Sequence, residues 1–189
     1  MQIADRARAI RLILFDVDGV LTDGKILLHA DGTESKQFDI RDGTAIVWAR
    51  RAGLTVGFLS ARSSAATAQR AAQLGVTLVH QGVESKLDTY EQIVDALLLD
   101  HAAVAYMGDD VLDLPVLLRC GLAAAPADAA PDVRERVHWI SRAAGGNGAA
   151  RELIDMVLKV QDKWADLLAG YLVRRARPSE PVVESGETA

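Results

Sequence analysis

Two aspartates, Asp16 and Asp18, stand directly after an apolar run over residues 10–15. A short hydrophobic run bounded by turn residues predicts a buried strand. Polar residues at the carboxyl end of such a strand lie where open α/β sheets build their binding sites. Two carboxylates this close together repel each other unless a cation joins them or one of them keeps a proton. The pair therefore predicts a site for a metal ion or for acid–base chemistry.

Polar clusters also follow three further strand-like runs. They are Ser60-Ala61-Arg62, Lys86, and Gly108-Asp109-Asp110 with Asp113. Any one of them has a simpler interpretation, because acids and serines after strands often cap helices or turn the chain. Asp109, for example, is also placed to cap a helix that starts at residue 111. All four clusters in one chain, in this order, favour a shared pocket, since the carboxyl ends of parallel strands meet at one edge of a sheet.

Strand-like and helix-like segments alternate along the chain and predict the elements that position these residues. We expect strands over 11–15, 54–59, 77–79, 104–107 and 122–124, and helices over 43–52, 63–74, 85–99, 111–118 and 149–172. This alternation is typical of parallel strands joined by helical crossovers. The predicted fold is α/β, a three-layer sandwich with a mainly parallel Rossmann-like sheet.

One segment, residues 25–38, interrupts the alternation. Two strand-like runs over 25–29 and 33–38 flank an Asp-Gly turn and predict a β-hairpin. Because the hairpin leaves the first strand before any helix has formed, it should project from the carboxyl edge of the sheet. It is either a surface ornament or, through an apolar face of Ile26, Leu28 and Phe38, a contact with another subunit, and exposed apolar patches favour the contact.

Length and composition indicate a soluble protein with one domain. The 189 residues allow a single domain over 1–173 followed by a Pro- and Glu-containing tail over 174–189, which we expect to be disordered. The net charge of −5 argues against nucleic acid or a membrane surface as partner. Cys120 is the only cysteine, and its apolar neighbours predict an inert core thiol. The chain shows no signal peptide and no membrane span, which predicts a cytoplasmic location.

The motifs together resemble a known superfamily. Residues 15–24, Ser60, Lys86 and residues 108–113 are similar to the four motifs of the haloacid dehalogenase-like phosphatases, and this resemblance spans about residues 11–151. Residues 16–24, 41–43, 59–62 and 145–152 more closely resemble the 3-deoxy-D-manno-octulosonate 8-phosphate phosphatase family. That family implies a fold without a cap domain and a homotetramer in which hairpin 25–38 completes a neighbouring site. In agreement with this resemblance, the intervals between Asp18 and Ser60 and between Lys86 and Asp109 are too short to hold a cap domain.

The resemblance implies a role for each catalytic residue, and the chemistry of the side chains agrees with it. Asp16 is the expected nucleophile, forming an aspartyl-phosphate. The cofactor is expected to be Mg²⁺, held by Asp16, the backbone carbonyl of Asp18 and Asp109. Asp18 would protonate the leaving alkoxide and then deprotonate the attacking water. Ser60 would donate a hydrogen bond to the phosphoryl group, and Lys86 would supply positive charge to it.

The remaining site predictions concern the rest of the substrate. Asp110 and Asp113 are expected to orient metal-bound waters or Lys86. The resemblance makes five further residues substrate-contact candidates, namely Arg41, Asp42, Gly43, Ala61 and Arg62. An arginine suits the carboxylate of a sugar-acid phosphate, which it binds through two hydrogen bonds.

The resemblance implies a phosphomonoesterase that hydrolyses 3-deoxy-D-manno-octulosonate 8-phosphate in lipopolysaccharide biosynthesis. Two alternatives stay open at the level of the sequence. One is a phosphatase for a nine-carbon 2-keto-3-deoxy sugar-acid 9-phosphate of the sialic-acid type. The other is a non-catalytic oligomer that binds a sugar phosphate, because a fold alone does not establish an activity.

Overall fold

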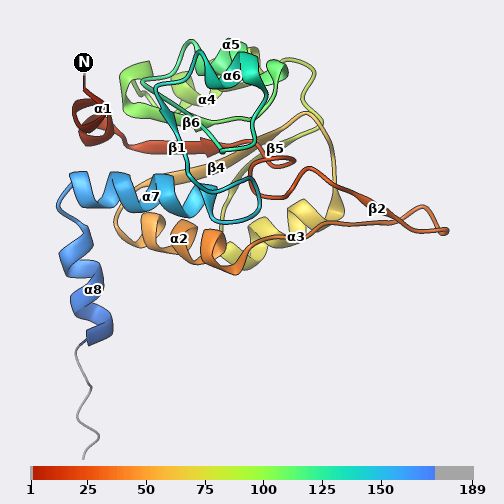
Figure 1. The fold of residues 1–189 in the computed structure, drawn as a ribbon, viewed down its shortest axis with the longest axis horizontal. Helices are drawn as coiled ribbons and strands as arrows, with labels where there is room; N and C mark the ends of the chain where they lie inside the picture. Colours follow the sequence, from red (N-terminus) through yellow and green to blue (C-terminus); the bar gives the residue numbers. More distant parts are fainter. Residues whose placement is uncertain (1, 173–189) are drawn as a thin grey trace, which may run out of the picture.

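A parallel sheet of six strands forms the centre of the molecule (Figure 1). The computed structural model describes residues 2–172. The strand order is β5-β4-β1-β6-β7-β8, and every neighbouring pair is parallel. The strands are β1 (Leu12–Phe15), β4 (Thr55–Ser60), β5 (Leu78–Gln81), β6 (Val104–Met107), β7 (Leu122–Ala125) and β8 (Trp139–Ile140).

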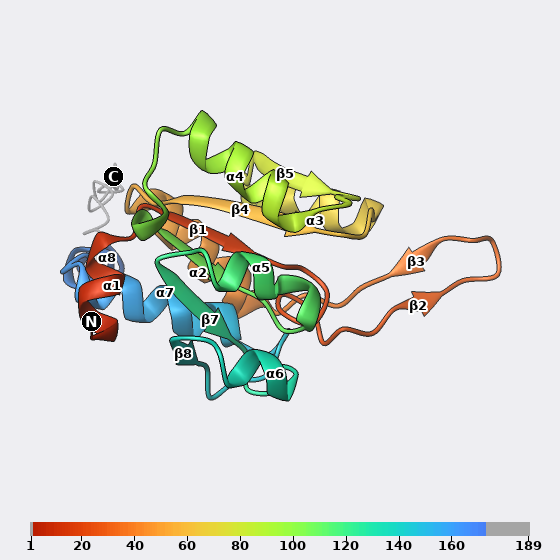
Figure 2. The same cartoon turned by 90° about the horizontal axis from the view of Figure 1, so that it is seen from above.

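Helices cover both faces of this sheet, which confirms the predicted three-layer α/β fold. The helices are α1 (Ile3–Ala9), α2 (Ile40–Arg51), α3 (Ala65–Leu74), α4 (Lys86–Ala96), α5 (Leu114–Leu117), α6 (Pro131–Arg134), α7 (Ala149–Val160) and α8 (Trp164–Leu172), with 3₁₀ turns η1 (His101–Ala103) and η2 (Val111–Asp113). In Figures 1 and 2, α4, α5 and α6 lie on one face and α2, α3 and α7 on the other.

The apolar run of β1 alternates between the two faces. Ile13 and Phe15 pack into the core beneath α2, α3 and α7, whereas Leu12 and Leu14 pack against α4 and α5. All four side chains are fully buried. A strand covered on both faces needs a continuous apolar run, and this is why β1 shows no alternation of polar and apolar residues.

The order of the strands on the two sides of β1 creates a crevice beyond its carboxyl end. From β1 the sheet grows through β4 and β5 on one side and through β6 and β7 on the other. Phe15, the last residue of β1, is paired with Phe58 and with Met107, so the three strands end close together. Ligands of open α/β sheets bind at such a switch point, outside the carboxyl ends of the strands.

The predicted hairpin is present and projects from this edge (Figure 2). Its paired strands are short, with β2 (Leu27–Leu28) against β3 (Glu34–Ser35). Leu28 is 73% exposed. Phe38, in contrast, packs against the main core below Arg70, so it is not part of an exposed hairpin face as we expected.

The prediction of a single helix over residues 149–172 is wrong. The chain forms α7 and α8 instead, and the break lies at Asp162, which has a φ of 57°. Aspartate is one of the few residues that enter this left-handed region at low cost. Next to it, the Gln161 side chain donates hydrogen bonds to the carbonyls of Ala7 (3.0 Å) and Ile10 (2.8 Å). The turn after α7 therefore also ties down the end of α1.

Other differences are small. The sequence patterns missed α1, α6 and β8, and the helix expected over 111–118 is η2 followed by α5. Cys120 is buried as predicted, and burial raises the pKa of its thiol to about 12. Within residues 2–172, no helix is both long enough and apolar enough to cross a membrane. The predicted disordered tail over 174–189 lies outside the described residues.

Candidate active site

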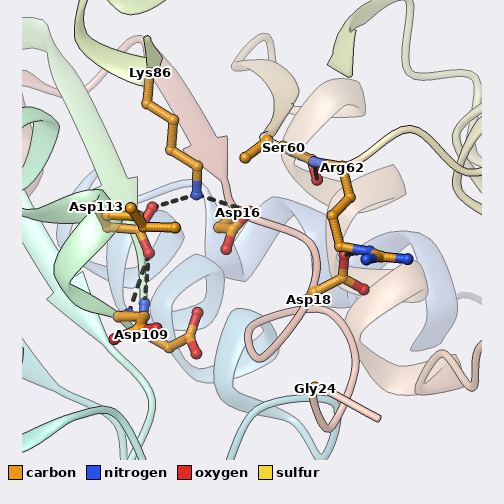
Figure 3. A pocket seen from close by; sticks show the side chains of 11 residues that line it. Asp16, Asp18, Gly24, Ser60, Arg62, Lys86, Asp109 and Asp113 are labelled. Atoms are coloured by element: carbon orange, nitrogen blue, oxygen red, sulfur yellow. Dashed lines mark hydrogen bonds and ion pairs between the residues drawn. The ribbon is translucent and has the colours of Figure 1, made fainter. Parts of the chain in front are cut away.

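A cavity of about 300 Å³ opens at the carboxyl edge of the sheet and brings the four polar clusters together (Figure 3). It is lined by Asp16, Asp18, Gly24, Ser60, Ala61, Arg62, Lys86, Asp109, Asp110, Leu112 and Asp113. Residues from segments far apart in the sequence thus share one pocket. Of the candidate residues, only Arg41, Asp42 and Gly43 do not line it.

The backbone beyond β1 fixes the position of the aspartate pair. The N–H of Asp16 donates to the Met107 carbonyl at 3.0 Å, which extends the pairing with β6 by one residue. The chain then closes a tight turn, in which the N–H groups of Leu21 and Thr22 donate to the Val17 carbonyl at 2.9 and 3.0 Å. This turn keeps Asp18 at the cavity instead of carrying it away from the sheet.

Gly19 allows Asp109, a candidate metal ligand, to approach this turn. Its φ is 94°, and a Cβ at this position would lie 2.1 Å from Oδ2 of Asp109. Only glycine combines this backbone conformation with such close contact. The side chain of Asp109 therefore reaches the loop that carries Asp16 and Asp18 because position 19 has no side chain.

Lys86 joins the nucleophile candidate to a buried aspartate. It is the first residue of α4, and its Nζ lies 3.1 Å from Oδ1 of Asp16 and 2.6 Å from Oδ1 of Asp113. Burial lowers the pKa of Lys86, but Asp16 and Asp113 raise it more, so the net shift is upward. Lys86 stays charged and points into the cavity (Figure 3).

Asp113 is fully buried, and both of its carboxylate oxygens are in use. Oδ1 accepts hydrogen bonds from Lys86 and from the hydroxyl of Tyr106. Oδ2 accepts from the backbone N–H groups of Asp109 at 3.0 Å and Asp110 at 3.2 Å. With four donors satisfied, Asp113 orients its neighbours and has no oxygen left to bind a metal ion. Asp110 itself caps η2, since its carboxylate accepts from the N–H of Val111.

The surroundings of Asp16 and Asp109 disfavour negative charge on these two carboxyl groups. Burial and the nearby Asp113 raise the pKa of Asp16 to about 6, although Lys86 opposes the shift. Burial, Asp16 and Asp113 raise the pKa of Asp109 to about 8. Oδ1 of Asp109 is buried and has no hydrogen-bond partner. An all-oxygen donor set with an unpaired buried oxygen fits a hard divalent cation such as Mg²⁺.

Asp18 has a different cation, which the sequence reasoning missed. Lys36, which directly follows β3, places its Nζ 2.6 Å from Oδ1 and 2.8 Å from Oδ2 of Asp18. Glu34, in β3, accepts from Arg62 at 3.1 Å. No strand pattern indicates the contact of Lys36 with Asp18, because residue 36 lies outside the paired strands of the hairpin.

The remaining substrate candidates lie at the start of α2. Arg41 forms an ion pair with Asp39 and donates to the side chain of Asn147. Asp42 is buried and accepts hydrogen bonds from the backbone N–H groups of Gly148 (3.2 Å) and Arg151 (2.7 Å). It therefore joins the start of α2 to the start of α7.

The glycine turn before α7 contacts the loop of the aspartate pair. A Cβ on Gly145 would lie 1.8 Å from the carbonyl oxygen of Gly19. The N–H of Gly146 donates to the Val20 carbonyl at 2.9 Å. This turn, residues 145–148, supports the active-site loop from behind.

Comparisons with known proteins agree with this geometry. No protein-family model matches the chain. The chain is 39% identical over 161 residues to the 3-deoxy-D-manno-octulosonate 8-phosphate phosphatase of Yersinia pestis, covering 85% of this chain and 86% of that protein. A probable YrbI family phosphatase from Pseudomonas syringae is 43% identical, with a TM-score of 0.88 over 90% of this chain and 97% of that one.

A third relative was crystallised with ligands. It is the 3-deoxy-D-manno-octulosonate 8-phosphate phosphatase of Moraxella catarrhalis, in complex with magnesium, phosphate and the sugar acid. It is 32% identical, and its TM-score of 0.87 covers 89% of this chain and 97% of that chain.

Proposed function

The chain belongs to the 3-deoxy-D-manno-octulosonate 8-phosphate phosphatases of the haloacid dehalogenase-like superfamily, and from this membership we propose that it hydrolyses 3-deoxy-D-manno-octulosonate 8-phosphate. The products are the free sugar acid and phosphate, in lipopolysaccharide biosynthesis. The observation that carries the proposal is the placement of Asp16, Lys86 and Asp109 around one cavity at the switch point of the sheet.

Asp16 is the proposed nucleophile. Its carboxylate oxygen attacks phosphorus, the bond from phosphorus to the sugar oxygen breaks, and an aspartyl-phosphate forms. Asp18 gives its proton to the leaving alkoxide and takes a proton from the water that later attacks phosphorus. The two residues thus divide the reaction into two displacements, and the second returns Asp16 to its carboxylate.

Lys86 and Ser60 bind the transferring group in this proposal. The ammonium of Lys86 lies beside Asp16, where it stabilises negative charge on the phosphoryl oxygens. Ser60 is buried at the end of β4, and its hydroxyl is available to donate to one of these oxygens. Asp113 keeps Lys86 in place.

The proposed cofactor is Mg²⁺. Asp16, Asp109 and the backbone carbonyl of Asp18 would hold it, and Asp113 would not, because its oxygens already accept four hydrogen bonds. When bound, the cation offsets repulsion between the incoming phosphate and the carboxylates.

Substrate selectivity is proposed to come from Arg62, Ala61 and the start of α2. Arg62 lines the cavity and is half-exposed, so its guanidinium is available to the carboxylate of a sugar acid. Arg41, Asp42 and Gly43 do not line the cavity of their own chain, and we assign them a contact only in the assembled oligomer. Ile40, beside them, is 79% exposed, as expected of a residue that another subunit covers.

The proposed assembly is a homotetramer in which hairpin 25–38 completes the site of a neighbour. Its support is the exposure of Leu27 (63%) and Leu28 (73%) on the projecting hairpin. Light scattering after size-exclusion chromatography should give a tetramer for the wild type and smaller species for Leu27→Asp/Leu28→Asp. A monomeric wild type would contradict the assembly.

A substrate panel tests the proposed activity. Phosphate release should be measured from 3-deoxy-D-manno-octulosonate 8-phosphate and from a nine-carbon sugar-acid 9-phosphate, with MgCl₂ or with EDTA. We expect the eight-carbon substrate to have the higher kcat/KM, and Asp16→Asn or EDTA to abolish release. A higher kcat/KM for the nine-carbon substrate would overturn the assigned substrate, and equal rates for wild type and Asp16→Asn would overturn the mechanism.

A further inference from the structure

Lys36 is a buried cation inside a segment that otherwise projects into solvent. Its side chain is 1% exposed, and its ammonium contacts both oxygens of Asp18, at 2.6 and 2.8 Å. Burying a lysine restricts a long flexible side chain and removes an ammonium from water, so such a contact needs a compensating partner. Asp18 is that partner.

The side chain of Asp18 depends on Lys36 for its position. Among residues 2–172, no other group donates a hydrogen bond to this carboxyl, and Nε of Arg62 lies farther away, at 3.8 Å from Oδ2. Glu34 forms ion pairs with both Arg62 and Lys36, at 3.1 and 3.9 Å. The four charges alternate in sign, so the ammonium stays aligned with Asp18.

The two aspartates after β1 therefore have separate cations. Lys86 contacts Asp16, whereas Lys36 contacts Asp18. Lys86 comes from the body of the domain, but Lys36 comes from the base of the hairpin. The hairpin thus contributes to the site of its own chain, independently of any contact that its tip makes.

We propose that Lys36 is a positioning residue for proton transfer by Asp18, a role that rests on the proposed phosphatase function. Its ammonium, in contact with both oxygens, holds the Asp18 carboxyl at the cavity while one of these oxygens exchanges a proton with the leaving group or with water. As the proton moves to the alkoxide, negative charge develops on Asp18, and the adjacent ammonium stabilises that charge. Lys36 thereby lowers the barrier of those steps in which Asp18 transfers a proton.

Leaving groups that differ in basicity separate this role from a structural one. A sugar alkoxide is strongly basic and needs a proton as it leaves, whereas p-nitrophenolate leaves without one. General acid catalysis typically contributes about 10²- to 10⁴-fold, so loss of positioning should cost a part of that. A residue that only supports the fold or binds phosphate would affect both substrates alike.

The test is single-turnover kinetics with enzyme in excess, which isolates the first displacement. For Lys36→Met we expect release of the sugar acid from 3-deoxy-D-manno-octulosonate 8-phosphate to slow about 10- to 100-fold. Release of p-nitrophenol from p-nitrophenyl phosphate should change less than about 3-fold, since it needs no general acid. Lys36→Arg should recover part of the loss. Lys159→Met is the matched control, because Lys159 is an exposed lysine of α7 that does not line the cavity, and it should leave both rates unchanged.

A double-mutant cycle supplies the second readout. If Lys36 acts through Asp18, Lys36→Met should slow sugar-acid release less than about 2-fold in an Asp18→Asn background, because coupled residues are not additive. Equal losses on the two substrates, or additive losses in the cycle, would overturn the proposal. Should the wild type leave the sugar-acid phosphate intact, the proposed function fails separately. Glucose 6-phosphate or another alkyl phosphate that the wild type hydrolyses then replaces it in the comparison.

Discussion

Replacing Asp113 by Asn changes the centre of the hydrogen-bond network while keeping its shape. Asp113 is fully buried and accepts from Lys86, Tyr106 and the N–H groups of Asp109 and Asp110. An amide has one accepting oxygen, so its NH₂ group must face two donors in either orientation. Asp113→Asn therefore leaves two buried donors unpaired whichever way the side chain turns.

The size of the effect follows from the donors that are lost. If the NH₂ group faces the two backbone N–H groups, each unpaired donor costs about 1–3 kcal/mol. If it faces Lys86, a buried ion pair is broken at about 3–5 kcal/mol. Loss of the negative charge of Asp113 offsets a part of this cost in stability, because Asp113 raises the pKa of both Asp16 and Asp109. We expect a net loss of about 2–4 kcal/mol in unfolding free energy.

Urea denaturation and steady-state kinetics check this prediction. The same substitution should lower kcat about 10- to 100-fold, since Asp113 orients Lys86. Asp110→Asn is the matched control, because Asp110 is exposed and its side chain only caps the start of η2, and it should cost less than about 1 kcal/mol. Equal stability losses for the two variants would refute the assignment of Asp113 as the centre of the network.

Three further predictions concern the metal site and the support behind it. Gly19→Ala should weaken Mg²⁺ activation about 10-fold or more through its contact with Asp109. Gly53→Ala, with a φ of 84° and open space, should leave the activation constant unchanged, and equal constants for the two variants would contradict the contact. Without Mg²⁺, Asp109→Asn should melt at a higher temperature than the wild type, because burial and the nearby Asp16 both disfavour an ionisable acid at this position. Mg²⁺ should raise the melting temperature of the wild type alone. Burial raises the pKa of Asp42 to about 6 in the folded protein, so this group stabilises the fold fully below pH 4 and loses that contribution as the pH rises to 6. The stability of Asp42→Asn relative to wild type should therefore improve by about 3 kcal/mol between pH 4 and 7, and denaturation curves that show no such change would contradict the buried carboxyl.

Local sequence patterns were sufficient for every strand of the sheet except β8 and for the residues at its carboxyl edge. Four apolar runs became β1, β4, β5 and β6, and parallel pairing placed the polar residue after each run in one cavity. Strand burial and chain direction follow from short segments, so the site at the switch point could be predicted without knowledge of the packing.

The errors come from interactions between distant segments. The break at Asp162 coincides with hydrogen bonds from Gln161 to the end of α1, more than a hundred residues earlier. The sequence analysis did not single out Lys36, and only the folded chain brings it to Asp18. The hydrogen bonds that Asp42 accepts from N–H groups at the start of α7 were also missed, and its predicted substrate contact stays a prediction. None of these contacts leaves a periodic signal in the sequence.

The central claim is that Asp16 becomes phosphorylated, and trapping the intermediate tests it most directly. Asp18→Asn should slow hydrolysis of the aspartyl-phosphate, because no carboxylate then accepts a proton from the attacking water. The variant should be mixed with p-nitrophenyl phosphate and Mg²⁺, quenched in acid within one turnover, digested, and analysed by mass spectrometry. We expect one phosphoryl group on the peptide that contains Asp16, and none in the double variant that also carries Asp16→Asn. A phosphoryl group on another residue, or p-nitrophenol release at the wild-type rate after Asp16→Asn, would contradict the claim.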